Sequence, residues 1–99
     1  MTDSLLSRRY RIFGRVQGVG FRYFAQQVAA ALRLSGWVRN RADGSVELLA
    51  DGTREQLDEL EAEIRCGPRL ARVDRVDVSP AAPSGETGFR ITYDERRRL

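Results

Sequence analysis

One segment, residues 12–22, constrains this chain more than any other, because three glycines lie in it between an expected strand and an expected helix. It reads Ile-Phe-Gly-Arg-Val-Gln-Gly-Val-Gly-Phe-Arg. Gly14, Gly18 and Gly20 remove side chains from the connection, so backbone N–H groups can turn toward a common centre at the helix N-terminus. The helix dipole favours an anion at that point. The segment therefore predicts a site for a phosphate-sized anion.

Arg22 ends this segment inside the first turn of the expected helix. The dipole disfavours a cation there unless a negative ligand or partner lies nearby. Most helix arginines are simply solvated, but Arg22 directly follows the glycine-rich turn, so we expect it to contact the anion. Gly14 is interpreted as a strand bulge or a strand end, and Gly18 and Gly20 are the glycines that we expect to face the ligand. Arg15 is close enough to the loop to add attraction for an anion.

The spacing of apolar residues predicts seven elements of secondary structure. Asp43 and Gly44 supply the turn of a hairpin. Thr53 and Gln56 form a capping box for the second helix, and Gly67 is expected to end it. In chain order, we expect a strand over 8–15, a helix over 21–34, a strand over 37–40, a strand over 45–50, a helix that follows Thr53, a strand over 71–79 and a short strand over 89–93.

This order predicts an α+β fold. Strand, helix, strand, strand, helix, strand is the order of a ferredoxin-like split βαβ sandwich, with two helices on one face of an antiparallel sheet. Here a short C-terminal strand ends the pattern. The chain has 99 residues, which fit one domain over 1–99. Residues 1–7 and 94–99 are expected to be flexible tails.

The same spacing divides the side chains into core and surface. Acidic residues, including Glu47, Asp51 and the run 58–61, are expected in solvent on the hairpin and on one helix face. Cys66 is expected to be a small buried or half-exposed residue and not a nucleophile. The residues expected in the core are Phe21, Phe24, Trp37, Val46, Leu48, Ala50, Leu57, Leu60 and Ile64.

Composition excludes several kinds of function. The chain has no histidine and one cysteine, Cys66, so it has no internal disulfide, no cysteine cluster for a metal and no histidine base. Its net charge of +3 favours anionic partners. No segment approaches the roughly 20 apolar residues of a membrane span, and the first ten residues lack the apolar core of a signal peptide. We therefore expect a cytoplasmic protein, and its size favours a monomer.

Two motifs together resemble a known family. The run from Gly14 to Arg22 is followed by Gly36-Trp-Val-Arg-Asn40 and then by Asp43-Gly-Ser-Val46. This combination resembles the acylphosphatase family, and it is more specific than a glycine-rich loop alone. The order of elements matches from Ser7 to Tyr93, whereas the family pattern does not explain the arginines beyond Tyr93. The resemblance implies hydrolysis of acyl phosphates to a carboxylate and inorganic phosphate, without a metal or cofactor.

The resemblance also implies roles for individual residues. Arg22 takes the position of the family's phosphate-binding arginine, and Asn40 that of the asparagine that holds the attacking water. Asn40 by itself would be interpreted as a turn residue, so its role depends on the pairing with Arg22. Inorganic phosphate is expected as both product and inhibitor. The backbone loop that binds phosphate corresponds to Gln17, Gly18, Val19, Gly20 and Phe21.

Two functions without catalysis are the alternatives. One is an RNA-binding or anion-binding ferredoxin-like domain, because arginines accompany Tyr10 and Phe13 on the first strand. The aromatic pattern fits RNA recognition poorly, since the third strand offers Glu47 and Leu49 on the same face, so a nucleic acid partner is not expected. The other is a regulatory domain of the kind that begins larger carbamoyl-transfer maturation proteins. A chain of 99 residues that starts at Met1 is expected to be complete, which disfavours this second alternative.

Overall fold

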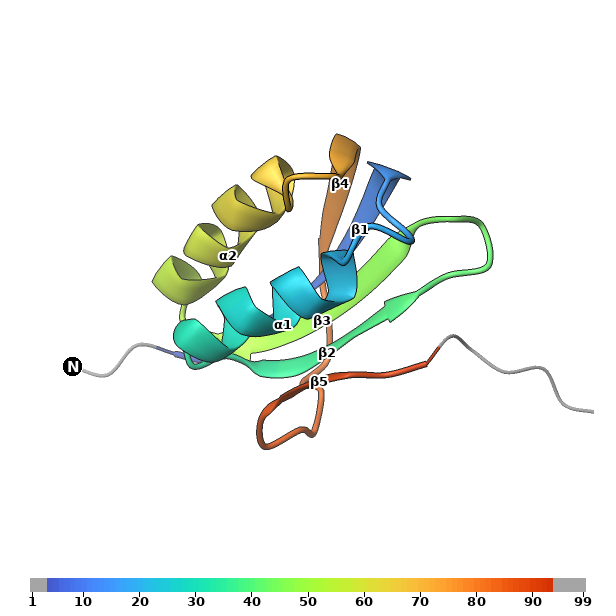
Figure 1. Cartoon of the computed structure of the whole chain (residues 1–99). Coiled ribbons are helices and arrows are strands. Elements are labelled where there is room, and N and C mark those ends of the chain that lie inside the picture. Colours follow the sequence, from blue (N-terminus) through green and yellow to red (C-terminus); the bar gives the residue numbers. More distant parts are fainter. Residues whose placement is uncertain (1–3, 94–99) are drawn as a thin grey trace, which may run out of the picture.

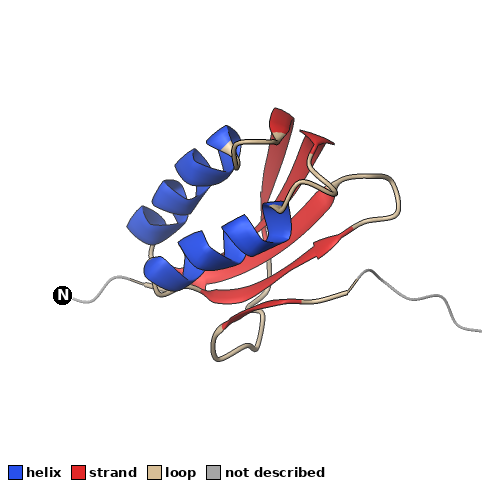
Figure 2. Cartoon of the chain, in the orientation of Figure 1, coloured by secondary structure: helices blue, strands red, loops and turns tan. Residues whose placement is uncertain are grey.

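Two helices lie side by side on one face of a five-stranded sheet in the part of the chain that the computed structural model describes, residues 4–93 (Figures 1 and 2). The predicted ferredoxin-like α+β sandwich is therefore confirmed. The tails expected over residues 1–3 and 94–99 lie outside the described residues. The elements are β1 (Leu6–Arg15), α1 (Phe21–Ala31), β2 (Ser35–Asn40), β3 (Val46–Gly52), α2 (Arg54–Cys66), β4 (Arg72–Pro80) and β5 (Phe89–Ile91).

The strand order in the sheet is β4-β1-β3-β2-β5. The first four strands pair antiparallel, as predicted, whereas β5 pairs parallel to β2. The sheet is therefore mixed. The physical reason is the connection over residues 81–88, which carries the chain from β4 at one edge to the opposite edge of the sheet and does not form a hairpin (Figure 1).

Several element boundaries differ from the prediction. β1 takes in Leu6 and Ser7, which were expected in the N-terminal tail, because these residues pair with the end of β3. That end extends through Gly52, which was expected to lie beyond the strand. α1 stops at Ala31, three residues before Leu34. Arg33 adopts a left-handed φ of 63°, and the turned chain then buries Leu34.

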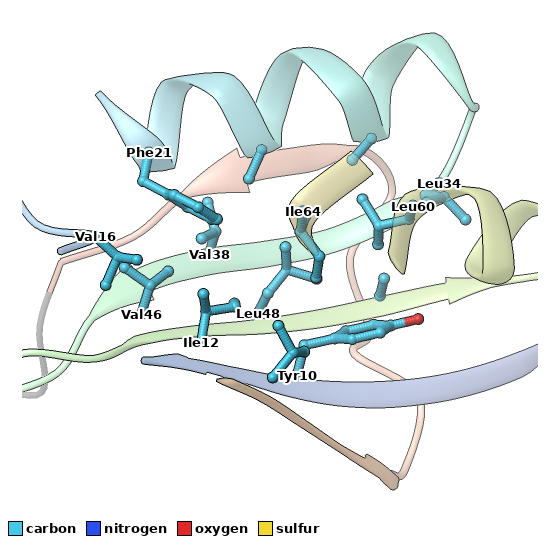
Figure 3. Close-up of a cluster of buried hydrophobic side chains, with 14 of the residues drawn as sticks. Tyr10, Ile12, Val16, Phe21, Leu34, Val38, Val46, Leu48, Leu60 and Ile64 are labelled. Carbon is cyan, nitrogen blue, oxygen red and sulfur yellow. The ribbon is translucent and has the colours of Figure 1, made fainter. Parts of the chain in front are cut away.

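The core lies between the helices and the sheet (Figure 3). The stripe of β3 and the stripe of α2 are buried as predicted, and α2 begins with the predicted capping box of Thr53 and Gln56. Tyr10 joins the two layers, since its hydroxyl donates to the carbonyl of Leu57 at 3.2 Å. The buried side chains confirmed from the prediction are Phe21, Val46, Leu48, Ala50, Leu57, Leu60 and Ile64.

Side chains of the opposite sheet face depart from the prediction. Trp37 is half-buried on the face away from the helices, because its neighbour Val38 takes the inward position, and the guanidinium of Arg39 lies 5.0 Å from its ring centroid. Glu47, expected in solvent, is only 4% exposed.

Two side chains on the helices also differ from the prediction. Phe24 of α1, expected in the core, is half-buried, and Cys66 of α2, expected to be buried or half-exposed, is exposed.

Candidate active site

The start of α1 has no side-chain hydrogen bond from its N-cap residue. Gly20 is the N-cap residue, with φ 80° and ψ 19°, and it offers no side chain to the helix. No acidic residue lies in the first turn of α1, whereas α2 has both its capping box and Glu55. The first N–H groups of α1 are therefore open to an anion from outside the described chain.

The glycines before α1 divide into two kinds. Gly14 lies at an irregularity of the ladder between β1 and β4, and a Cβ there would meet the carbonyl oxygen of Arg72 at 2.1 Å. Gly14 is thus required by close backbone approach. Gly18 and Gly20 have positive φ values, yet a Cβ at either position would meet no atom of the described residues within 4 Å. These two glycines face open space, as expected for a backbone that receives a ligand.

Gln17 and Val19 fix the loop by their side chains. The Gln17 side-chain amide donates to the carbonyl of Arg41 at 2.8 Å and to the carbonyl of Ser45 at 2.9 Å. Val19 is partly buried and packs against the core cluster, which includes the fully buried Val16. The loop is therefore attached to the β2–β3 turn on one side and to the core on the other.

The β2–β3 turn that receives this attachment has hydrogen bonds of its own. Ser45 donates to one oxygen of Asp43 from its backbone N–H at 2.9 Å and from its hydroxyl at 2.6 Å. Arg11 donates to the other Asp43 oxygen at 2.7 Å. The hydrogen bonds from Ser45, and after them the charge of Arg11, lower the pKa of Asp43, so the carboxylate form of this side chain is favoured.

A pocket of about 330 Å³ brings the expected site residues together. Arg22 reaches it from the first turn of α1, and Asn40 from the last position of β2. Gly18, Gly20 and Phe21 line it as well, whereas Gln17 and Val19 do not. The remaining lining residues are Val16, Tyr23, Ile91 and Tyr93.

Arg22 and Asn40 bring free hydrogen-bonding groups to this pocket. Within residues 4–93, neither side chain forms a hydrogen bond or an ion pair. Other arginines of the chain do form such pairs; Arg8, for example, contacts Asp58 at 2.8 Å. The pocket thus combines a half-buried guanidinium, a side-chain amide and uncapped helix N–H groups, a set suited to a phosphoryl group and a water molecule.

Four residues of the pocket wall were not predicted from the sequence. Tyr23 is 63% exposed and Tyr93 is 80% exposed, although both are large and partly apolar. Tyr23 had a visible signal, because it lies beside Arg22 and off the apolar stripe of the helix. Ile91 and Tyr93 reach the pocket only because β5 pairs with β2, which the local sequence does not indicate.

Two further features of the described residues bear on function. Across residues 4–93, no helix is long and apolar enough to cross a membrane. In the same part of the chain, no group of three or more Asp, Glu and Cys side chains is arranged to hold a metal ion.

Known proteins are similar to this chain in sequence and in fold. The family model for acylphosphatase matches residues 8–91. An acylphosphatase of Koribacter versatilis is 57% identical, over 92% of this chain and 84% of its own length. One of Moorella thermoacetica is 49% identical, over 89% of this chain and 95% of its own.

Solved structures give the same picture. The acylphosphatase of Bacillus subtilis superposes with a TM-score of 0.86 at 40% identity, covering 91% of this chain and all of its own. Full-length HypF in a phosphate- and nucleotide-bound form superposes with a TM-score of 0.87 at 26% identity. That match covers 96% of this chain but only 13% of HypF.

Proposed function

The chain belongs to the acylphosphatase family and hydrolyses acyl phosphates, and we propose that Arg22 and the loop over residues 17–21 bind the phosphoryl group while Asn40 orients the attacking water. The observation that supports this assignment is the shared pocket. It brings the guanidinium of Arg22, the side-chain amide of Asn40 and the open N–H groups of α1 together without partners among residues 4–93.

Phosphoryl transfer depends mainly on positioning and on stabilising negative charge. Backbone N–H groups at Gly18, Gly20 and the start of α1 donate to the phosphoryl oxygens, and the planar guanidinium of Arg22 donates two parallel hydrogen bonds. The ligand's negative charge also compensates for the cation in the first turn of α1. Arg22 is thereby stabilised most when the pocket is occupied.

Asn40 acts on the water and not on the proton. A carboxamide has no useful pKa as a base, but its oxygen accepts a hydrogen bond from water and aims a lone pair of that water at phosphorus. The water proton then passes to a phosphoryl oxygen of the substrate or to solvent. Attack on phosphorus forms one P–O bond and breaks the bond to the acyl oxygen, which leaves as a carboxylate with the bonding electron pair.

The leaving group explains why this chain needs no histidine. A carboxylic acid has a pKa of about 4, so the carboxylate departs at neutral pH without a proton from a general acid. The pocket accordingly needs to bind the negative phosphoryl group and to orient the attacking water, and it does not need to deliver a proton to the leaving group. Neither a metal nor a cofactor takes part in the steps proposed here.

We also propose which wall receives the acyl group. Once the phosphoryl group occupies the loop and Arg22, the rest of the pocket is bordered by Val16, Ile91 and the rings of Tyr23 and Tyr93. These side chains offer apolar carbon and aromatic faces. We therefore assign the acyl part of the substrate to this wall and expect it to favour aromatic over small acyl groups.

Release of inorganic phosphate from benzoyl phosphate, in a buffer that contains a chelator, tests the proposed function. Asn40→Ala should lower kcat far more than it weakens competitive inhibition by phosphate. Arg22→Gln should both lower kcat and weaken that inhibition. Arg54→Gln, an exposed arginine in the first turn of α2, serves as a matched control. Full turnover in Asn40→Ala would contradict the water-positioning role, and loss of activity with the chelator would contradict the metal-independent mechanism.

The cellular setting of the enzyme completes the proposal. We propose that the chain acts as a cytoplasmic monomer on small acyl phosphates, and that it has no nucleic acid partner. In the proposed monomer, the pocket is lined by α1, β2, the loop before α1 and the segment around β5 of the same chain. Activity per molecule should therefore not change when the protein is diluted through the nanomolar range.

A further inference from the structure

Among residues 4–93, β2 has a paired strand on only one side at Asn40. The Asn40 backbone is opposite Val46 of β3. On the other side, within the described residues, β5 pairs with β2 as far as Val38, whose carbonyl accepts a hydrogen bond from the Thr92 N–H at 2.9 Å. The strand pairs of residues 4–93 therefore hold the Asn40 peptide from one edge.

The two residues that flank Asn40 are anchored on the opposite face of the sheet. Side chains alternate along a strand, so Arg39 extends away from the pocket that Asn40 borders, and Arg41 extends to the same carboxylate as Arg39. Nε of Arg39 donates to Oε1 of Glu47 at 3.0 Å, and Nη1 of Arg41 donates to the same oxygen at 2.9 Å. Both neighbours of Asn40 are thus attached to a single carboxylate oxygen.

The carboxylate that makes this attachment is unusually enclosed. The side chain of Glu47 is 5% exposed, and Arg9 contacts its second oxygen at 3.1 Å. Burial by itself raises the pKa of Glu47, but the hydrogen bond from Arg39 and the charges of Arg39 and Arg41 outweigh burial and lower it. Glu47 therefore carries a negative charge at neutral pH. A buried charge is costly unless it is paired, and here it is paired three times.

We propose that Glu47 is a positioning residue for the hydrolysis, because it holds Arg39 and Arg41 and thereby fixes the peptide that presents Asn40 to the pocket. This inference rests on the proposed role of Asn40. Glu47 touches neither the substrate nor the water, since it lies on the other face of the sheet. Its effect on the reaction passes through the direction of the Asn40 side chain, and misplacement by about 1 Å can cost roughly 100-fold in rate.

A double-mutant cycle between Glu47→Gln and Asn40→Ala tests the proposal. Glu47→Gln should lower kcat by about 10- to 100-fold while the inhibition constant for inorganic phosphate stays within about twofold. In the Asn40→Ala background, Glu47→Gln should lower the residual kcat by less than about twofold, because the side chain it positions is gone. Arg9→Gln is the control: Arg9 contacts Glu47 from β1 but does not flank Asn40, so kcat should stay within about twofold.

Each outcome of the cycle decides something. If Glu47→Gln lowers kcat by the same factor in both backgrounds, Glu47 has only a structural role and the inference is overturned. If Asn40→Ala loses activity while Glu47→Gln does not, the inference fails and the proposed function stands. Full activity in Asn40→Ala overturns both.

A second variant covers the case in which Glu47→Gln does not fold. Arg39→Gln removes one of the two anchors and leaves the buried carboxylate paired with Arg9 and Arg41. The same cycle with Asn40→Ala should show a loss of kcat of about fivefold or more that disappears when Asn40 is absent. A native circular dichroism spectrum establishes folding, and an unchanged kcat in folded Arg39→Gln overturns the proposal.

Discussion

The side-chain amide of Gln17 donates to the backbone carbonyl of Arg41 at 2.8 Å, which joins the loop before α1 directly to the residue that follows Asn40. A second hydrogen bond from the same amide, to the carbonyl of Ser45 at 2.9 Å, fixes its orientation. The two parts of the proposed mechanism, phosphate binding and water positioning, are therefore held at a set separation by one side chain.

Gln17→Leu should remove the link between the loop that binds phosphate and the residue that follows Asn40. Leucine has a similar size but donates no hydrogen bond, so the carbonyls of Arg41 and Ser45 lose a partner. We expect kcat/KM to fall by about 10-fold or more, and the free energy of unfolding to fall by about 1–3 kcal/mol. Gln27→Leu, an exposed glutamine of α1, is the control and should change neither quantity. Wild-type kcat/KM in folded Gln17→Leu would show that the bridge does not matter for catalysis.

Gly14→Ala and Gly20→Ala should affect stability and activity in opposite order. At Gly14 the new Cβ meets the carbonyl oxygen of Arg72, so we expect a loss of about 3 kcal/mol or more. At Gly20 the space is open, and only the positive φ is strained, by about 1–2 kcal/mol. Gly20→Ala should nevertheless lose more activity when both variants are folded, because it changes the backbone that we assign to phosphate. Urea denaturation and the phosphate-release assay measure the two effects.

Local chemistry made much of the fold predictable from the sequence. The capping box of Thr53 and Gln56 acts within four residues, and it forms as predicted. The buried stripe of β3 needs only alternation, and Val46, Leu48 and Ala50 are buried. Features that depend on contacts between neighbouring strands could not be predicted in this way. The prediction that Glu47 lies in solvent was wrong. The arginines that enclose it are Arg9 of β1, Arg39 of β2 and Arg41, which are not its neighbours in the local sequence pattern.

The candidate site shows the same division. Arg22 was conspicuous from the sequence, because a cation in an uncapped first turn opposes the helix dipole. Alternation alone could not place Asn40 near it; that expectation came from the family resemblance. Tyr93 was missed as part of the wall, since it reaches the pocket through the parallel pairing of β5 with β2. The Gln17 bridge spans 24 residues and has no local signature.

Protonation of Asp51 should loosen the segment that brings β5 to the pocket. Asp51 accepts hydrogen bonds from the hydroxyls of Ser7 and Ser35 at 2.6 and 3.0 Å, and from the Ser84 N–H at 3.0 Å. Burial raises its pKa, but these hydrogen bonds outweigh burial and lower the pKa below the ordinary 3.8. The stabilisation is therefore complete above pH 3.8 and is lost as the pH falls through the lower value of the folded state.

Asp51→Asn makes this contribution measurable. The free energy of unfolding of the wild type should exceed that of the variant at pH 6, and the difference should shrink as the pH falls below 3.8. Other carboxylates titrate in both proteins, so the difference isolates Asp51. Glu59→Gln removes an exposed charge from α2 and should leave the pH dependence of the wild type unchanged. A difference between wild type and Asp51→Asn that stays constant from pH 6 to pH 2 would contradict the assignment.

Tyr23→Ala should change which acyl group the enzyme prefers without changing how it binds phosphate. The ring of Tyr23 borders the pocket beside Arg22 but is 63% exposed, so its contribution is that of one aromatic contact at the edge of a site. Such a contact is worth about 0.5–1.5 kcal/mol, which corresponds to a roughly 2- to 12-fold fall in the ratio of kcat/KM for benzoyl phosphate to that for acetyl phosphate. Tyr23→Phe retains the ring and should retain the ratio.

Inhibition by inorganic phosphate is the control. It should be the same in the wild type, Tyr23→Ala and Tyr23→Phe, because phosphate occupies only the loop and Arg22. An unchanged ratio in Tyr23→Ala would place the acyl group elsewhere, and a parallel loss of phosphate inhibition would mean that Tyr23 acts on Arg22 instead.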